Sequence, residues 1–112
     1  MKYIEGRRIL GVQPMPDMPQ LPANVVVYKT TREFTETTVP AGLLRAHTTK
    51  EGTWGRIVVL EGALHYALSD DDGPGWLLEP GVLGIVEPTV PHQVTPRGAV
   101  RFKVEFLRVE AP

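Results

Sequence analysis

Two histidines and one glutamate are the residues of this sequence best suited to do chemistry together. His47 and Glu51 stand four residues apart, and His92 follows Pro91 farther along the chain. Imidazole and carboxylate groups can share one divalent metal ion, and such a set suits Fe(II), Mn, Zn or Ni because affinity alone does not select among them. A bound metal would polarise an oxyanion or activate water. The alternative is that a backbone carbonyl satisfies His92 and that Glu51 is solvated at a hairpin tip.

The spacing of His47 and Glu51 is compatible with a strand or a helix. A four-residue spacing aligns two side chains on a helix. Two threonines followed by Gly52 and Gly55 favour a strand instead. On a strand alternate side chains share a face, which would align Leu43, Arg45, His47, Thr49 and Glu51.

Several other side chains are candidates for lining a pocket around this site. Arg45 either enters the cavity, where it would bind an anionic group, or stays exposed at the rim. His65 is either a further ligand or a surface histidine, since the sequence does not settle which strand face is interior. Trp54 either lines the pocket mouth or caps the core. Further candidate polar lining comes from Tyr28, Thr49 and Gln93.

Composition excludes several classes of protein and of site. The 112 residues are enough for one domain with a single core. A formal net charge of −1 gives no basic field for nucleic acid and no polybasic segment for an anionic membrane. Because the sequence has no cysteine, disulfides, thiol catalysis and thiolate metal sites are excluded. No apolar run approaches the roughly 20 residues of a membrane span and no signal peptide is recognisable, so we expect a cytoplasmic protein.

Eleven glycines and eleven prolines are spread along the chain at short intervals, which predicts many short strands joined by turns. Tight turns at Glu61-Gly62 and at 96–98 would separate the strands beside them. No segment has the periodicity of an amphipathic helix. Strands are expected over residues 24–31, 54–60, 63–69, 76–78, 82–86, 92–95 and 100–109, with a shorter extended piece near residue 34.

The last expected strand, residues 100–109, has the clearest pattern. Phe102, Val104 and Phe106 alternate with charged residues, as in an antiparallel strand with one buried face. Together these patterns predict a single all-β domain, a small antiparallel β-barrel or jelly roll of eight or more strands.

Residues 1–22 are predicted to form an N-terminal arm and Pro-rich linker ahead of a β domain at 23–112. Four prolines between residues 14 and 22 make this segment stiff and extended and keep it out of a central sheet. The arm is either a mobile tail or an extension that reaches onto a second subunit. The second alternative predicts a homodimer.

The motifs around the two histidines resemble those of the cupin superfamily. They read Gly42-x4-His47-x3-Glu51-x10-Gly62, followed by Gly81-x5-Glu87-Pro88-x3-His92. More narrowly, residues 21–108 are similar to the cupin-like domain of the tellurite-resistance protein TehB and its stand-alone relatives. The segments that carry this similarity are 28–30, 38–40, 47–54, 59–62, 86–92 and 104–106.

This resemblance implies a small β-barrel whose interior holds a divalent metal through His47, Glu51 and His92. The common cupin first motif has two histidines separated by one residue, and Thr49 stands in the second place here. TehB couples such a domain to a methyltransferase. The 112 residues contain no methyltransferase segment, so methyl transfer to tellurite or selenite is not carried over.

Three functions are compatible with these observations. The first is a small cupin-like protein that binds a divalent metal and a small anionic molecule, linked to tellurite or oxyanion stress. The second is a metal-free binding or sensing module whose pocket uses Arg45, His92 and the tryptophans, and the third is a structural, dimerising domain. No nucleophile with a neighbouring base, no phosphate loop and no paired acids stand out, so the sequence leaves catalysis open.

Overall fold

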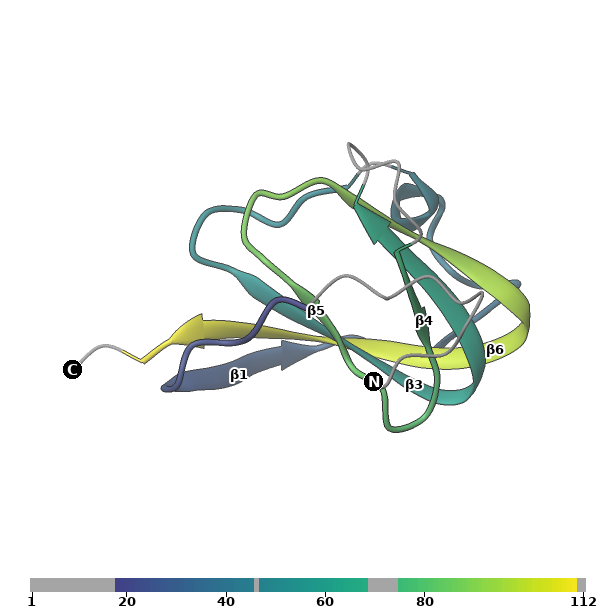
Figure 1. The fold of residues 1–112 in the computed structure, drawn as a ribbon, viewed down its shortest axis with the longest axis horizontal. Coiled ribbons are helices and arrows are strands. Elements are labelled where there is room, and N and C mark those ends of the chain that lie inside the picture. Colours follow the sequence, from purple (N-terminus) through teal and green to yellow (C-terminus); the bar gives the residue numbers. More distant parts are fainter. Residues whose placement is uncertain (1–17, 46, 69–74, 111–112) are drawn as a thin grey trace, which may run out of the picture.

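Strands make up nearly all the regular structure in the computed structural model, which describes residues 18–45, 47–68 and 75–110 (Figure 1). One 3-10 helix, η1 (Ala41–Leu44), is the single helical element of these residues. The prediction of an all-β antiparallel domain with almost no helix is confirmed. The strands are β1 (Val25–Thr30), β2 (Phe34–Thr35), β3 (Trp54–Leu68), β4 (Trp76–Leu78), β5 (Gly84–Val86) and β6 (His92–Val109).

Strands β3 and β6 are far longer than expected, and they pair with each other along most of their length (Figure 1). The predicted turns at Glu61-Gly62 and at 96–98 are wrong, because both segments lie inside these strands. The pairing continues past them with register shifts between Val59 and Glu61 and between Gly62 and Leu64. Shifts of this kind mark β-bulges or larger irregularities in the pairing, which bend a strand without reversing it.

Glycine makes the bend possible on both strands. Gly62 of β3 has φ +80° and Gly98 of β6 has φ +76°, a backbone region that other residues rarely adopt. A Cβ atom on Gly62 would lie 2.1 Å from the carbonyl oxygen of Ala99 on β6, so no side chain fits there. Positive φ serves a hairpin turn and a bulge equally well, which is why the sequence suggested a turn at this place.

The described strands form one sheet in the order β1-β6-β3-β4, with β2 paired to β6 and β5 paired to β3. Because β1 and β4 end this order without pairing with each other, the sheet is open. The predicted closed barrel is therefore wrong, and the jelly roll stays a prediction. The bends fold the sheet over without bringing its two end strands together.

The bend divides the sheet into two halves. In the first half, the beginning of β3 pairs with the end of β6 and with β5; in the second, the end of β3 pairs with the beginning of β6 and with β4. Side chains from both halves are buried in one core: Ile57, Val59, Val86 and Phe102 from the first, and Leu64, Tyr66, Trp76, Leu78 and Val94 from the second. Burying these side chains together supplies the main stabilisation of the folded-over sheet.

Tyr66 ties the two halves to each other. Its ring stacks on Trp76 of β4 with centroids 5.1 Å apart, and its hydroxyl donates a 2.8 Å hydrogen bond to the carbonyl oxygen of Ile85 on β5. Burial raises the pKa of Tyr66 well above its usual value, so the hydroxyl keeps its proton and remains a donor.

Residues 1–17 of the predicted N-terminal arm lie outside the described residues. Met18 packs against the core, and its sulfur accepts a 3.4 Å hydrogen bond from the backbone N–H of Ile85. No helix among the described residues has the length and hydropathy needed to cross a membrane.

Candidate functional site

The backbone brings His47 and His92 together. Each donates its N–H to the carbonyl oxygen of the other, with both hydrogen bonds 2.9 Å long. Two residues that exchange both bonds in this way lie directly opposite each other, with their side chains on the same side. The two imidazole rings accordingly meet nearly at right angles, with centroids 5.4 Å apart.

A short turn after His47 leads the chain into β3. The buried Thr49 hydroxyl donates a 2.7 Å hydrogen bond to the carbonyl oxygen of Thr53, and the N–H of Thr53 donates to the carbonyl oxygen of Lys50. The N–H of Thr89 donates to the carbonyl oxygen of Thr49, which joins this turn to the loop before β6. These bonds fix Thr49 in the turn, and Thr49 lines the same cavity as both histidines.

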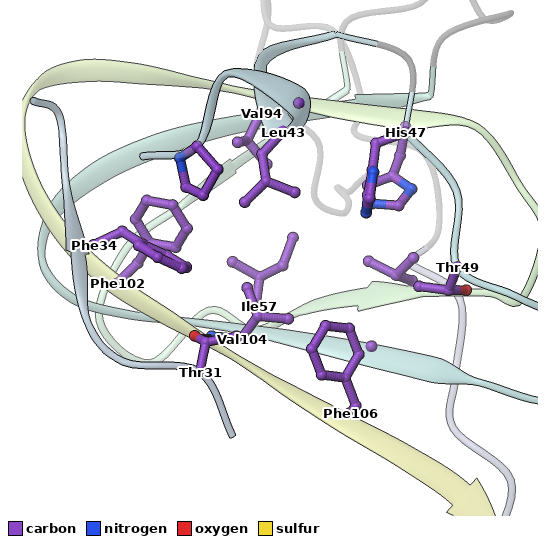
Figure 2. A pocket seen from close by; sticks show the side chains of 15 residues that line it. Thr31, Phe34, Leu43, His47, Thr49, Ile57, Val94, Phe102, Val104 and Phe106 are labelled. Atoms are coloured by element: carbon purple, nitrogen blue, oxygen red, sulfur yellow. Dashed lines mark hydrogen bonds between the residues drawn. The ribbon is translucent and has the colours of Figure 1, made fainter. Parts of the chain in front are cut away.

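A cavity of about 290 Å³ lies between the two halves of the sheet (Figure 2). Its walls are mainly apolar. Phe102, Val104 and Phe106 all line it, so they share one face of the strand as predicted, although Val104 and Phe106 are only partly buried. Leu107, which has the opposite parity along the strand, is buried as well. The other lining residues are Thr31, Phe34, Pro40, Gly42, Leu43, His47, Thr49, Gly55, Ile57, Val86, His92 and Val94.

Three of the polar lining residues, His47, Thr49 and His92, gather at one end of this cavity, whereas Thr31 lies toward the other end. Figure 2 shows His47 and Thr49 at that end, with Phe34 and Phe102 at the other. His92 lies beside His47. A molecule in the cavity would therefore meet aromatic rings on one side and imidazole nitrogens on the other.

His92 is buried and neutral at physiological pH. Burial is the main reason that its pKa falls below the usual value, the nearby His47 lowers it further, and a hydrogen bond to the backbone of Val90 partly offsets both. The Nδ1 atom lies 3.1 Å from the Val90 carbonyl oxygen. Because a carbonyl can only accept, the proton of the neutral ring is on Nδ1 and the lone pair is on Nε2.

Glu51, the expected third metal ligand, lies exposed in the turn after Thr49. Strand alternation places side chains on one face only while the chain stays extended, and the hydrogen bond from Thr53 to Lys50 ends that extension. Over residues 18–45, 47–68 and 75–110, no three histidine, cysteine or carboxylate side chains form a group that could hold a metal ion. The structure brings together the two histidines of the expected set.

The expected pocket residue Arg45 is exposed and follows η1 directly. The 3-10 helix breaks the alternation that was to align Arg45 with His47, although Leu43 still reaches the cavity from η1. Within the described residues Arg45 does not line the cavity.

Trp54, His65 and Gln93 are half-buried and also lie outside the lining among the described residues. Each alternates along its strand with a residue of the interior face: Trp54 with Gly55, His65 with Leu64, and Gln93 with His92. Their side chains therefore point to the opposite face of the sheet.

A second hollow, also of about 290 Å³, opens beside the histidine end of the cavity. Two of its residues, Lys29 and Lys50, were not among the expected site residues. Lys50 directly follows Thr49 in the first motif, and this position is the one signal in the sequence that could have indicated it. The hollow is lined by Tyr28, Lys29, His47, Thr48, Thr49, Lys50, Thr53 and Phe106.

A family model described as the TehB-like domain matches residues 29–104. The chain belongs to the TehB-like domain family. The matched range contains both histidines, Thr49 and the bend at Gly62, so the family covers the site as well as the scaffold. The wider cupin relationship stays a prediction.

Two solved structures are similar to this TehB-like domain. One is a protein from E. coli strain K12, with a TM-score of 0.73 and 24% identity over 84% of this chain and 100% of that chain. The other is TehB from Haemophilus influenzae, with a TM-score of 0.71 and 25% identity over 78% of this chain and 32% of that chain. The domain thus spans about a third of that TehB chain. No curated protein sequence matches it.

Proposed function

We propose that this TehB-like domain binds a small organic molecule in the cavity between the two halves of its sheet. The observation that carries the proposal is an apolar cavity of about 290 Å³ that ends at two adjacent histidines. Ligand pockets in proteins are mainly apolar, with a few polar groups that orient the ligand. The aromatic walls would bury the apolar part of the ligand, and Nε2 of His92 would accept a hydrogen bond from it.

This lining suits an organic molecule better than a bare oxyanion. An oxyanion such as tellurite would lose its hydration among Phe102, Ile57 and Val104, which is costly without charged partners. The family relation to the tellurite-resistance protein TehB supports a role in oxyanion stress. We therefore place the domain in that response as the binder of an organic molecule.

Filling the cavity from its rim is expected to weaken this binding strongly. Leu43 lines the cavity, whereas its neighbour Leu44 is 44% exposed and does not line it in the described structure. Leu43→Trp should weaken binding of benzyl alcohol, a neutral probe with one ring and one hydroxyl, at least about tenfold because the larger side chain takes its space. Titration followed by NMR chemical shifts measures this.

The matched control for this experiment is Leu44→Trp, which adds the same side chain one residue away and should leave the affinity unchanged. We expect millimolar affinity for so small a probe. Equal binding by both variants, or no saturable binding by the unmodified protein, would refute the proposal.

A second candidate function is a divalent metal site at the histidine end of the cavity. Two observations favour it. The two imidazole rings are adjacent. In addition, Nδ1–H of His92 donates to a backbone carbonyl, which leaves Nε2 available to bind a metal, as in many metal-ligating histidines. His47 and His92 would hold the ion, and a metal bound there would polarise an oxygen of the ligand. Glu51 is exposed in the turn and forms no group with the two histidines among the described residues, so the structure does not support it as a third ligand.

Metal titration separates the roles of these three residues. In protein first treated with a chelator, His47→Gln and His92→Gln should each weaken Zn²⁺ binding more than about tenfold, because two ligands bind far more tightly than one. Glu51→Gln should leave it unchanged, and His65→Gln is the control for a histidine on the other face. The metal site is refuted if calorimetry detects no binding or if His65→Gln is as damaging as His92→Gln.

A further inference from the structure

The cavity and the hollow beside it share part of their lining. Three residues, His47, Thr49 and Phe106, line both spaces. In Figure 2 these three side chains lie at the same end of the cavity, away from Phe34 and Phe102. A ligand that extends past them would have one part in the apolar cavity and the other in the hollow.

The hollow is positively charged, in contrast to the cavity. Lys29 of β1 and Lys50 of the turn are both exposed and both line it, and none of its described lining residues is acidic. The guanidinium group of Arg108 lies 5.2 Å from the ring centroid of Tyr28, which adds a third cation beside the hollow. Glu51, which follows Lys50, is not among the described lining residues.

Strand pairing places Lys29 at this end of the cavity. Lys29 pairs with Phe106 across β1 and β6, and Phe106 lines both spaces. Hydroxyl groups complete the hollow, since Tyr28 and Thr53 share a hydrogen bond of 3.2 Å between their oxygens. Ammonium and hydroxyl groups are the donors that bind an anionic oxygen.

We infer that the ligand is an organic acid with its apolar body in the cavity and its anionic group in the hollow near Lys29 and Lys50. This inference rests on the proposed small-molecule function and names the chemical class of the ligand. An apolar cavity of about 150 Å³ takes up benzene, so this larger one accommodates one substituted ring or a branched chain of similar size. Arg45, expected from the sequence to bind an anion, lines neither space in the described structure.

The test compares two probes that differ in charge but share a skeleton, 3-phenylpropionate and 3-phenylpropionamide. At low salt the acid should bind the unmodified protein about fivefold more tightly than the amide, because two exposed lysines each contribute a modest attraction. The double variant Lys29→Gln/Lys50→Gln should lose this preference and keep its affinity for the amide. NMR titration measures both affinities in one series.

The matched control is Arg97→Gln/Lys103→Gln, which removes the same two charges from residues outside both described linings and should keep the preference for the acid. Equal binding of acid and amide, or a preference that survives in the lysine variant or is lost in the control, overturns the inference but leaves the small-molecule function standing. If neither probe binds, both the inference and the proposed function fail.

Discussion

Replacing Gly62 by alanine is expected to lower the free energy of unfolding by more than about 3 kcal/mol. The residue has φ +80°, and the new Cβ would lie 2.1 Å from the carbonyl oxygen of Ala99. That oxygen belongs to the backbone of the partner strand, so it can move away only if β3 and β6 separate at the bend. Urea denaturation followed by tryptophan fluorescence measures the loss.

Gly98→Ala is the control that separates the clash from the cost of positive φ. Gly98 lies on the partner strand with φ +76°, and a Cβ there would meet nothing within 4 Å. We expect a loss of about 1 kcal/mol from backbone conformation alone. Equal losses of stability in the two variants would contradict this explanation, because they would show that the clash between a Cβ atom at residue 62 and the Ala99 carbonyl adds nothing to the cost of positive φ.

The second large effect is expected at Phe102, where substitution by alanine should lower the free energy of unfolding by about 3–5 kcal/mol. This side chain is fully buried, packs against Phe34 with ring centroids 5.6 Å apart, and closes the apolar end of the cavity. Its removal joins new empty space to the existing cavity, so the surrounding residues cannot collapse to fill it. Thermal and urea denaturation measure the change.

Phe106→Ala is the matched control for Phe102. Phe106 shares the same face of β6 but is only partly buried, at the end of the cavity that opens to the hollow. We expect Phe106→Ala to lower the free energy of unfolding by less than about 2 kcal/mol, because this substitution removes less buried apolar surface than Phe102→Ala does. A loss as large as that of Phe102→Ala would contradict the described position of the core.

The local strands were largely predictable, whereas the connections between them were not. Alternation in residues 100–109 correctly placed Phe102, Val104 and Phe106 on one face, because that periodicity depends only on neighbouring residues. It missed the burial of Leu107, which has the opposite parity. The bend at Gly62 was mistaken for a hairpin turn because both need a glycine with positive φ. Which of them forms depends on the partner strand, and nothing near Gly62 in the sequence specifies that partner.

The candidate site divides in a similar way. His47 and His92 were both placed in the predicted site, and they do lie next to each other. Hydrogen bonds between their backbones bring them together. Glu51 was included because alternation was extended through a segment that turns at Lys50. Lys29 was missed because its place beside the site depends on the pairing of β1 with β6, a contact between distant parts of the chain.

The most direct test of a binding site between the two halves of the sheet is to locate a bound probe by NMR. Intermolecular NOEs from the ring protons of 3-phenylpropionate should reach the methyl groups of Leu43, Ile57 and Val94, which line the cavity from η1 and from both halves. NOEs confined to exposed apolar side chains such as Leu77 and Leu83 would contradict the account, because they would place the ligand on the surface.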